Sequence, residues 1–415
     1  MKNYFFGLDV LRGLGIFTVL ILHSAFYYFD GIYEVDFNNP PAIVTAIGLL
    51  LMFAGMFATI SGFVHTLSTI RKTKQQISRR QRLKFSIVYG VVMLAIAYAY
   101  FIFTGPGIID FSSKSMNNSV LVELIRNGNL IPTNFERVFY IDSLVMIGTN
   151  IMLLAVFSFF VIKAVPAEKL HRAYFISGIM FMIISLIRIP LYTIWQNALD
   201  VSNYALYMFL NPFVAKNNPI FPFFAFALLG GWLATLTVIT DFKKICARVI
   251  PFSAILLVSG IMLYVNLEDT MLERAIDLKW YAIMIAQLGL FLLFFIAALR
   301  QFDYSKNKKR DLISVFFARF SKGGLTAFFL ESVVSVTIYR IISSIIPGFS
   351  VGIAGALLYG ICLALLWGIV LFLWEKAHYK FSLEYFIAQL MNKVGRSQKS
   401  DKLQGLLGEN DVRDD

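Results

Sequence analysis

Residues 8–23 read LDVLRGLGIFTVLILH, an apolar segment with few polar side chains. Two of these side chains, Arg12 and His23, stand eleven residues apart. At about 100° per residue, a helix brings both to one face, separated by about 16 Å along its axis. An Arg inside a membrane span costs about 2.5–3.5 kcal/mol on insertion scales, so such a residue is a functional candidate by default. The pair therefore directs the search for function.

The composition outside this segment is that of an integral membrane protein. The chain has 415 residues, of which 58% are hydrophobic and 15% charged, and it contains 41 Phe. A span needs about 20 largely apolar residues. We predict an all-α fold, a polytopic membrane helical bundle with about ten transmembrane helices, at 8–28, 42–70, 85–103, 141–162, 173–195, 219–239, 249–267, 280–299, 324–346 and 351–374.

The net charge of +12 is explained by topology. Lys and Arg gather in alternate loops and in both tails, as the positive-inside rule requires when both termini are cytoplasmic. Attraction to anionic membrane lipids is a secondary role for these charges, and nothing further indicates nucleic-acid binding. We expect one transmembrane domain, 1–396, a polar and disordered tail, 397–415, and residence in a bacterial or archaeal plasma membrane. Homo-oligomer formation stays open.

Three long polar or mixed stretches connect the predicted spans. The outer loop 104–140 is either a lid or short helix over a cavity, or a solvated connector. On the inner side, 300–322 and 379–396 mix basic and aromatic residues, which is typical of amphipathic helices in the membrane interface. The two cysteines and four histidines lack the paired spacing of metal ligands, so no metal is expected.

The positions of Arg12 and His23 suit donor binding at one end of the first helix and proton transfer at the other. Arg12 lies near the inner interface, where a guanidinium can clamp phosphate or anchor the helix. His23 lies deep in the outer half, where an imidazole is either a general base or a hydrogen-bonded interhelical residue. A donor with a phosphate-bearing head and a long, thin reactive arm fits this geometry. Acyl-coenzyme A has that shape.

Other ionisable residues within the predicted spans need partners. Glu331 and Arg340 are nine residues apart, on opposite faces of one helix, so they cannot pair. We expect Glu331 in the inner half, near Arg12 or the donor, or in an interhelical hydrogen bond. Arg188 and Arg340, in the outer half, either bind an anionic acceptor or reach the outer interface.

Three further residues complete the candidate set. Asp142 could orient His23, pair with Arg188, or cap the helix that it precedes. Asp9 is expected to be the N-cap of the first helix. His65, near the inner end of the second span, could position a thioester or form an interhelical bond.

Several motifs resemble those of transmembrane acyltransferases. The run from Asp9 to His23 resembles the acyltransferase-3 signature, an Arg, ten residues and a His on the first span. The whole chain also resembles the YeiB-like and heparan-glucosaminide N-acetyltransferase-like branch of that superfamily, although those relatives typically carry Asn where His23 stands. The further matches are Ile60-Ser61-Gly62-Phe63, Asn218–Phe223 leading to Leu229-Gly230-Gly231, Gly323-Gly324-Leu325-Thr326 at the opening of the ninth span, and Phe381-Ser382-Leu383-Glu384-Tyr385.

The resemblance implies a function for the first span. Arg12 would assist binding of the donor, acetyl-CoA, and His23 would be the base. We therefore expect an acyl-CoA-dependent membrane acyltransferase that passes an acyl group, most simply acetyl, to a hydroxyl or amine of a glycan or lipid-linked sugar at the outer face. The alternatives are a transporter of a polar or anionic compound and a noncatalytic relative.

Overall fold

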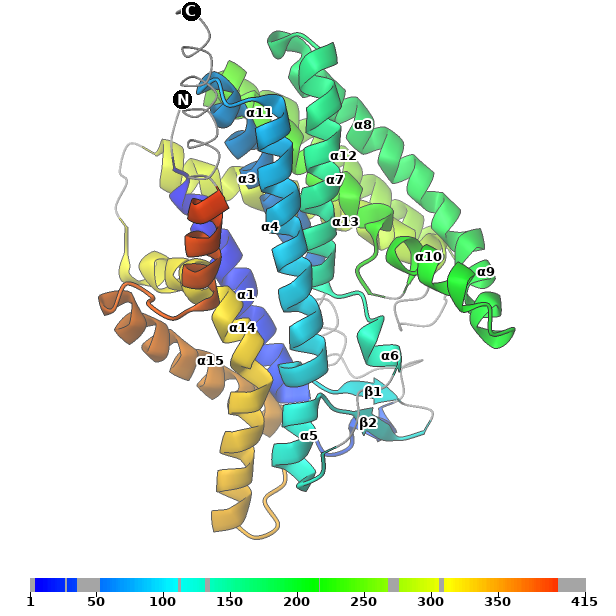
Figure 1. The fold of residues 1–415 in the computed structure, drawn as a ribbon, viewed down its shortest axis with the longest axis vertical. Helices are drawn as coiled ribbons and strands as arrows, with labels where there is room; N and C mark the ends of the chain where they lie inside the picture. Colours follow the sequence, from blue (N-terminus) through cyan, green and yellow to red (C-terminus); the bar gives the residue numbers. More distant parts are fainter. Residues whose placement is uncertain are drawn as a thin grey trace, which may run out of the picture.

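A computed structural model describes residues 4–26, 28–35, 53–110, 113–130, 135–215, 217–267, 276–305 and 310–394. Within these ranges the chain folds into a bundle of long helices with one small hairpin at one end (Figure 1). α1 begins, and the helix 383–394 ends, at the opposite end of the bundle, which also holds the loop between α3 and α4 (Figure 1).

The long helices confirm the predicted all-α polytopic bundle. Nine stretches of the described residues are long and apolar enough to cross a membrane. The helices are α1 (Phe6–Phe26), α3 (Ala54–Lys74), α4 (Arg79–Ala99), α7 (Ser143–Ala164), α8 (Leu170–Ile184), α9 (Arg188–Asp200), α10 (Tyr204–Val214), α11 (Ile220–Ile239), α12 (Phe242–Asn266), α13 (Leu278–Ala298), α14 (Leu312–Ile345) and α15 (Ile353–Lys376).

Two predicted spans differ in extent from the helices of the structure. Of the span 42–70, residues 42–52 lie outside the described ranges, and the rest belongs to α3. The span 173–195 is part of a longer apolar stretch, Ala167–Asp200, made of the short helix η4 (Ala167–Lys169), α8, a helical turn η5 (Ser185–Ile187) and α9. The short apolar helix α10 follows it and was not predicted.

The inner segment 300–322 is not the separate interface helix that we expected. Its first part is a π-helical extension of α13, η6 (Leu299–Tyr304), and its last part belongs to α14. Gly323 and Gly324 therefore lie inside α14 and do not open it. A helix is present in the second of these segments, at 383–394, and its position in the inner interface stays a prediction. The predicted tail, 397–415, lies outside the described residues.

Glu384, at the start of that C-terminal helix, holds a bend in α14. Its carboxylate accepts hydrogen bonds from the main-chain N–H groups of Leu325 (2.7 Å) and Thr326 (3.3 Å), and from the Thr326 hydroxyl (2.6 Å). In a straight helix such N–H groups bond to carbonyls one turn earlier. α14 changes direction between its first turns and the long remainder (Figure 1), and Glu384 binds α14 at Leu325 and Thr326.

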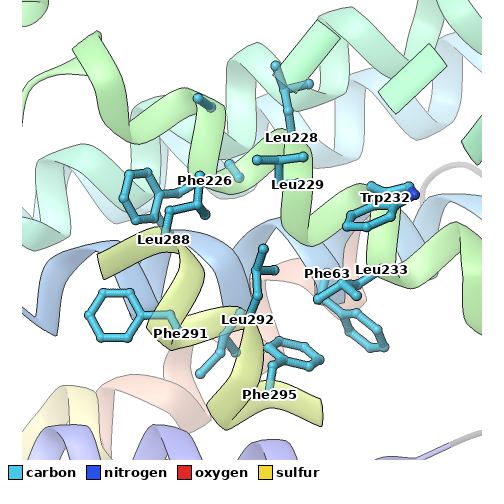
Figure 2. Packing of buried hydrophobic residues seen from close by; sticks show 14 of the residues in the cluster. Phe63, Phe226, Leu228, Leu229, Trp232, Leu233, Leu288, Phe291, Leu292 and Phe295 are labelled. Atoms are coloured by element: carbon cyan, nitrogen blue, oxygen red, sulfur yellow. The ribbon is translucent and has the colours of Figure 1, made fainter. Parts of the chain in front are cut away.

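The core lies between α3, α11 and α13. Aromatic and aliphatic side chains from these helices interdigitate there, among them Phe63, Phe226, Leu229, Leu292 and Phe295 (Figure 2). α11 is the central helix, with nearly every side chain buried. Because lipid is as apolar as leucine, close packing rather than exclusion from water stabilises such contacts. This core holds the scaffold against which α1 and α14 are placed.

α1 and α14 run side by side and carry the polar residues that matter for function (Figure 1). Gly13 allows the two backbones to meet, since a Cβ there would overlap the carbonyl of Phe317. Near the other end, the rings of Tyr28 and Tyr339 stack with centroids 4.5 Å apart. A small residue at a close helix crossing is typical of membrane proteins.

The loop 104–140, which we expect on the outer side, is folded in its described parts. It contains the antiparallel strands β1 (Ile108–Asp110) and β2 (Ser115–Asn117), the helix α5 (Val120–Asn127) and the turn α6 (Phe135–Val138). Arg137, buried among them, donates to the carbonyls of Phe101 (2.9 Å), Pro106 (2.9 Å) and Asn117 (2.5 Å). The predicted short outer helix is therefore present, as α5, and the loop is fixed to the end of the bundle.

Candidate functional site

The centre of the site is a hydrogen-bonded group of His23, Glu331 and Tyr100. The Nδ1 of His23 on α1 lies 2.5 Å from Oε1 of Glu331 on α14, and the Tyr100 hydroxyl donates to the same oxygen at 2.7 Å. Glu331 is 1% exposed, whereas the His23 side chain is 22% exposed. Burying a carboxylate costs several kcal/mol unless it is paired and hydrogen-bonded, so the two donors stabilise Glu331 in place.

The contact with Glu331 fixes how His23 can act. When Glu331 is ionised its carboxylate only accepts, so Nδ1 then carries the proton in this contact. In the neutral imidazole, Nε2 is then the acceptor and is left for a ligand. A histidine oriented by a buried carboxylate is the arrangement of a general base in hydrolases and transferases.

The sequence analysis missed Tyr100. It begins a π-helical turn, η3 (Tyr100–Thr104), that continues α4 to Gly105, whose N–H bonds back to the Tyr100 carbonyl at 2.6 Å. Its ring lies 4.7 Å from that of Phe328, which in turn lies 5.5 Å from the imidazole of His23. Single π-turns often occur at functional sites, but the sequence carries no signal for this one beyond its closeness to Gly105.

A cavity at the hairpin end of the bundle reaches His23; we call it the outer cavity, because the charge pattern predicts that this end faces outward. Its wall combines side chains of α1, α14 and α5 with the start of the folded outer loop, namely His23, Tyr28, Pro106, Gly107, Asn118, Val122, Arg126, Ser332 and Ser335. Five of these residues belong to the loop 104–140, so this loop is one wall of the cavity. The expectation of a helix over a cavity is thus confirmed, and whether that helix moves as a lid is not tested.

Arg12 lies at the other end of the same face of α1. Its Nη2 donates to the carbonyl of Ser321 on α14, and the Ser321 hydroxyl donates to Asp9 Oδ1 at 2.6 Å. Arg12 and His23 therefore both contact α14, as their spacing predicts. Between them, Ile16 packs on Gly324, and Arg12 is not among the residues of the outer cavity.

The expected capping role of Asp9 is wrong. Asp9 lies within the first turn of α1, where the Tyr4 hydroxyl also donates to it. The first two N–H groups of the helix, those of Phe6 and Gly7, bond instead to the carboxylate of Asp303 at 3.1 and 2.9 Å. A side chain nearly 300 residues away thus supplies the cap.

Glu331 also differs from expectation. It lies not beside Arg12 in the inner half but with His23, in the interhelical hydrogen bond that was the other possibility. Arg340, nine residues later, is exposed and does not line the cavity. The prediction that these two residues cannot pair agrees with this placement.

The remaining candidates have local roles. Asp142 is the N-cap of α7, accepting from the N–H groups of Leu144 and Val145 at 2.9 Å. Arg188 does not face an open acceptor site, because it is 2% exposed, donates to the carbonyls of Val214 and Ala215, and lies 4.5 Å from the Trp280 ring centroid. The ring of His65 lies 5.4 Å from that of Tyr89.

Together, the fold and this site define the class of the protein as a polytopic helical membrane protein with a His–Glu–Tyr group in its interior. Among the described residues, no three His, Cys, Asp or Glu side chains are placed to hold a metal ion. No model of a known protein family matches the chain, and no curated protein sequence matches it. The resemblance to acyltransferases therefore stays a prediction.

Proposed function

We propose that this protein is a membrane acyltransferase that takes an acyl group, most simply acetyl, from acyl-CoA and passes it to an acceptor at the outer face. One observation carries the proposal. His23 lines the outer cavity while Glu331 holds its Nδ1, so that Nε2 is the basic atom available to a ligand. The resemblance of the first span to the acyltransferase-3 signature supports the same assignment.

The chemistry needs no covalent enzyme intermediate. Nε2 of His23 takes the proton of the acceptor hydroxyl or amine as its oxygen or nitrogen attacks the thioester carbonyl. A carbon–oxygen or carbon–nitrogen bond forms, the carbon–sulfur bond breaks, and the coenzyme A thiolate leaves with the proton from the imidazolium. Glu331 stabilises that imidazolium while it exists. The products are the acylated acceptor, free coenzyme A and the restored imidazole.

Arg12 would hold the donor at the other end. A guanidinium binds phosphate through two parallel N–H groups, and its present partner, one main-chain carbonyl, leaves other N–H groups for such a ligand. The two residues are separated by about 16 Å along α1. Between Arg12 and His23, Ile16 on α1 contacts Gly324 on α14. The acyl-bearing arm of the donor must therefore separate the two helices at this contact or pass beside it.

The orientation in the membrane follows from charge. The basic loop between α3 and α4 lies at the end of the bundle where α1 begins (Figure 1). The positive-inside rule assigns that end to the cytoplasm, which places Arg12 toward cytoplasmic acyl-CoA and the cavity toward the outside. A bacterial or archaeal plasma membrane is the proposed location.

The test uses purified full-length protein in detergent or nanodiscs. Binding of acetyl-CoA is measured by calorimetry for the wild type, for Arg12→Ala and for Arg340→Ala as a matched control. The wild type and the control should bind alike, and Arg12→Ala should bind at least tenfold more weakly, because hydrogen bonds to charged groups contribute about 1.5–3 kcal/mol. Absence of binding to the wild type would end the proposal.

A transporter is the second candidate, favoured by the same buried histidine and carboxylate. Proton relays in membrane transporters use such pairs. This alternative predicts substrate flux into liposomes that depends on a proton gradient and not on coenzyme A. Transfer of labelled acetyl without such flux decides for the acyltransferase.

A further inference from the structure

The outer cavity beside His23 is small and polar. It leaves about 10 Å³ for the centre of a water molecule, and a buried cavity needs about 10–15 Å³ of such space to hold one water. An organic compound does not fit there. The side chains of His23, Asn118 and Ser332 are among those that form its wall. In this conformation the cavity therefore has the size for a single water molecule.

Two buried polar atoms in the wall have no hydrogen-bond partner within the described part of the chain. One is the hydroxyl oxygen of Ser332, a residue that is 6% exposed, and the other is the side-chain oxygen of Asn118. The amide nitrogen of Asn118 donates to Glu123 at 2.7 Å. A Cβ on Gly107 would lie 2.8 Å from the Asn118 oxygen, so this oxygen lies against a residue that lines the same cavity. Buried waters typically make about three hydrogen bonds to such groups.

His23 supplies a third partner for a water in the cavity. Its Nδ1 contacts Glu331 at 2.5 Å, so Nε2 is the ring nitrogen that a water can reach. When Nδ1 carries the proton, Nε2 accepts a hydrogen bond. A water that donates to Nε2 and to the Asn118 oxygen has both protons bonded, and its oxygen can accept from the Ser332 hydroxyl. One lone pair of that oxygen is then left for attack on a carbonyl carbon.

The charge of the wall favours water over a cation. Arg126 lines the cavity, and its Nη1 lies 3.1 Å from the sulfur of Met116, a weak acceptor that does not offset the charge. The described residues that line the cavity include no carboxylate. An ammonium or metal cation would meet an uncompensated positive charge there, whereas a neutral water does not.

We propose that the outer cavity holds one water molecule as a nucleophile, and that the protein hydrolyses acyl-CoA when no acceptor is present. This activity rests on the proposed function for delivery of the donor and for the basic role of His23. The water oxygen attacks the thioester carbonyl while Nε2 of His23 takes one of its protons. A carbon–oxygen bond forms, the carbon–sulfur bond breaks, and the coenzyme A thiolate leaves with the proton from the imidazolium. The second proton of the water stays on the product, so acetyl-CoA and water give acetic acid and free coenzyme A.

The experiment measures acetate release without any acceptor. Purified full-length protein in nanodiscs is mixed, in excess, with labelled acetyl-CoA, and empty nanodiscs give the spontaneous rate. The wild type should release acetate at least about 100-fold faster than the empty nanodiscs, the usual contribution of a general base. His23→Gln should lose this acceleration. A wild-type rate equal to the spontaneous rate would overturn the inference.

A pair of serine variants tests the position of the water. Ser332→Ala removes one of its three hydrogen bonds and should slow acetate release about twofold to tenfold, with acetyl-CoA binding unchanged in calorimetry. Ser344→Ala is the matched control, because Ser344 lies on the same helix and its exposed hydroxyl bonds to the Ile341 carbonyl. It should release acetate at the wild-type rate. Equal rates for the two variants would contradict the placement of the water beside Ser332.

Failure of the inference and failure of the proposed function are distinguishable. If labelled acetyl is transferred to methyl β-D-glucopyranoside but no acetate is released in its absence, the transferase proposal stands and the hydrolysis inference is wrong. If acetate is released with the expected dependence on His23 and Ser332 but no acetyl reaches the glucoside, the hydrolytic site stands and the transferase proposal fails.

Discussion

Replacing Glu331 tests the structure of the site most fully. Its Oε1 accepts from His23 and from Tyr100, at 2.5 and 2.7 Å, in a position that is 1% exposed. Glu331→Ala removes the acceptor of both hydrogen bonds, at about 1–3 kcal/mol each. The expected loss of stability is therefore about 2–6 kcal/mol. Tyr100→Phe removes only one of the two bonds and should cost about 1.5–3 kcal/mol, the value of a hydrogen bond to a charged group.

Glu331→Gln separates stability from chemistry. Glutamine keeps the shape and one oxygen for the two donors, but it lacks the charge that stabilises an imidazolium. Bonds to a charged partner are roughly twice as strong as neutral ones, so we expect a stability loss of about 1–2 kcal/mol. Acyl transfer should fall much further, by about 10²–10⁴-fold, since an Asp-to-Asn change beside the catalytic histidine of a serine protease lowers kcat by about 10⁴.

The assay pairs thermal unfolding in detergent with single-turnover transfer from labelled acetyl-CoA. Tyr100→Phe and Glu331→Gln should both unfold at temperatures between those of the wild type and Glu331→Ala. Glu331→Gln, although folded, should be nearly inactive. A Glu331→Gln protein that transfers acetyl at the wild-type rate would refute the role given to the carboxylate.

The other predictions concern helix ends, helix contacts and the donor. Asp303→Ala removes the cap of α1. It should therefore lower the free energy of unfolding by about 0.5–2 kcal/mol, the usual contribution of an N-cap. Chemical denaturation measures this change, and an unchanged midpoint would contradict the prediction. Gly13→Ala should reduce the melting temperature and the folded yield, because its Cβ would overlap α14. Gly352→Ala, with no atom within 4 Å of its Cβ, changes only the N-cap of α15 and should lower the melting temperature less. Equal behaviour would argue against the tight crossing. An acyl-CoA with a longer acyl chain should still bind more weakly to Arg12→Ala than to the wild type, because Arg12 is assigned to the phosphate-bearing head. Equal binding of this donor to both proteins in calorimetry would contradict the assignment.

The sequence predicted the common face of Arg12 and His23 on α1, because helix periodicity is a local property of the chain. Arg12 and His23 lie on one face, as eleven residues of helix require, and both contact α14. The same arithmetic separated Glu331 from Arg340. It could not identify the partner of Glu331, because His23 is 308 residues away in the chain and no local period links them.

The errors have the same origin. Asp9 has the residue type and position of a helix cap, yet Asp303 occupies that role from a distant turn. Gly323 and Gly324 suggested a helix start, but they lie inside α14, and Glu384 accepts from the N–H groups of Leu325 and Thr326 that follow them. In each case a side chain that is distant in the sequence makes the hydrogen bonds that we expected from the local sequence.

The central claim is that His23 is the base that accepts a proton from the acceptor. The direct measurement is transfer of labelled acetyl from acetyl-CoA to methyl β-D-glucopyranoside by wild-type protein and His23→Gln, with donor binding determined on the same samples. The variant should bind acetyl-CoA as the wild type does and transfer at least about 100-fold more slowly, the usual contribution of a general base. A His23→Gln protein with undiminished transfer would contradict the claim.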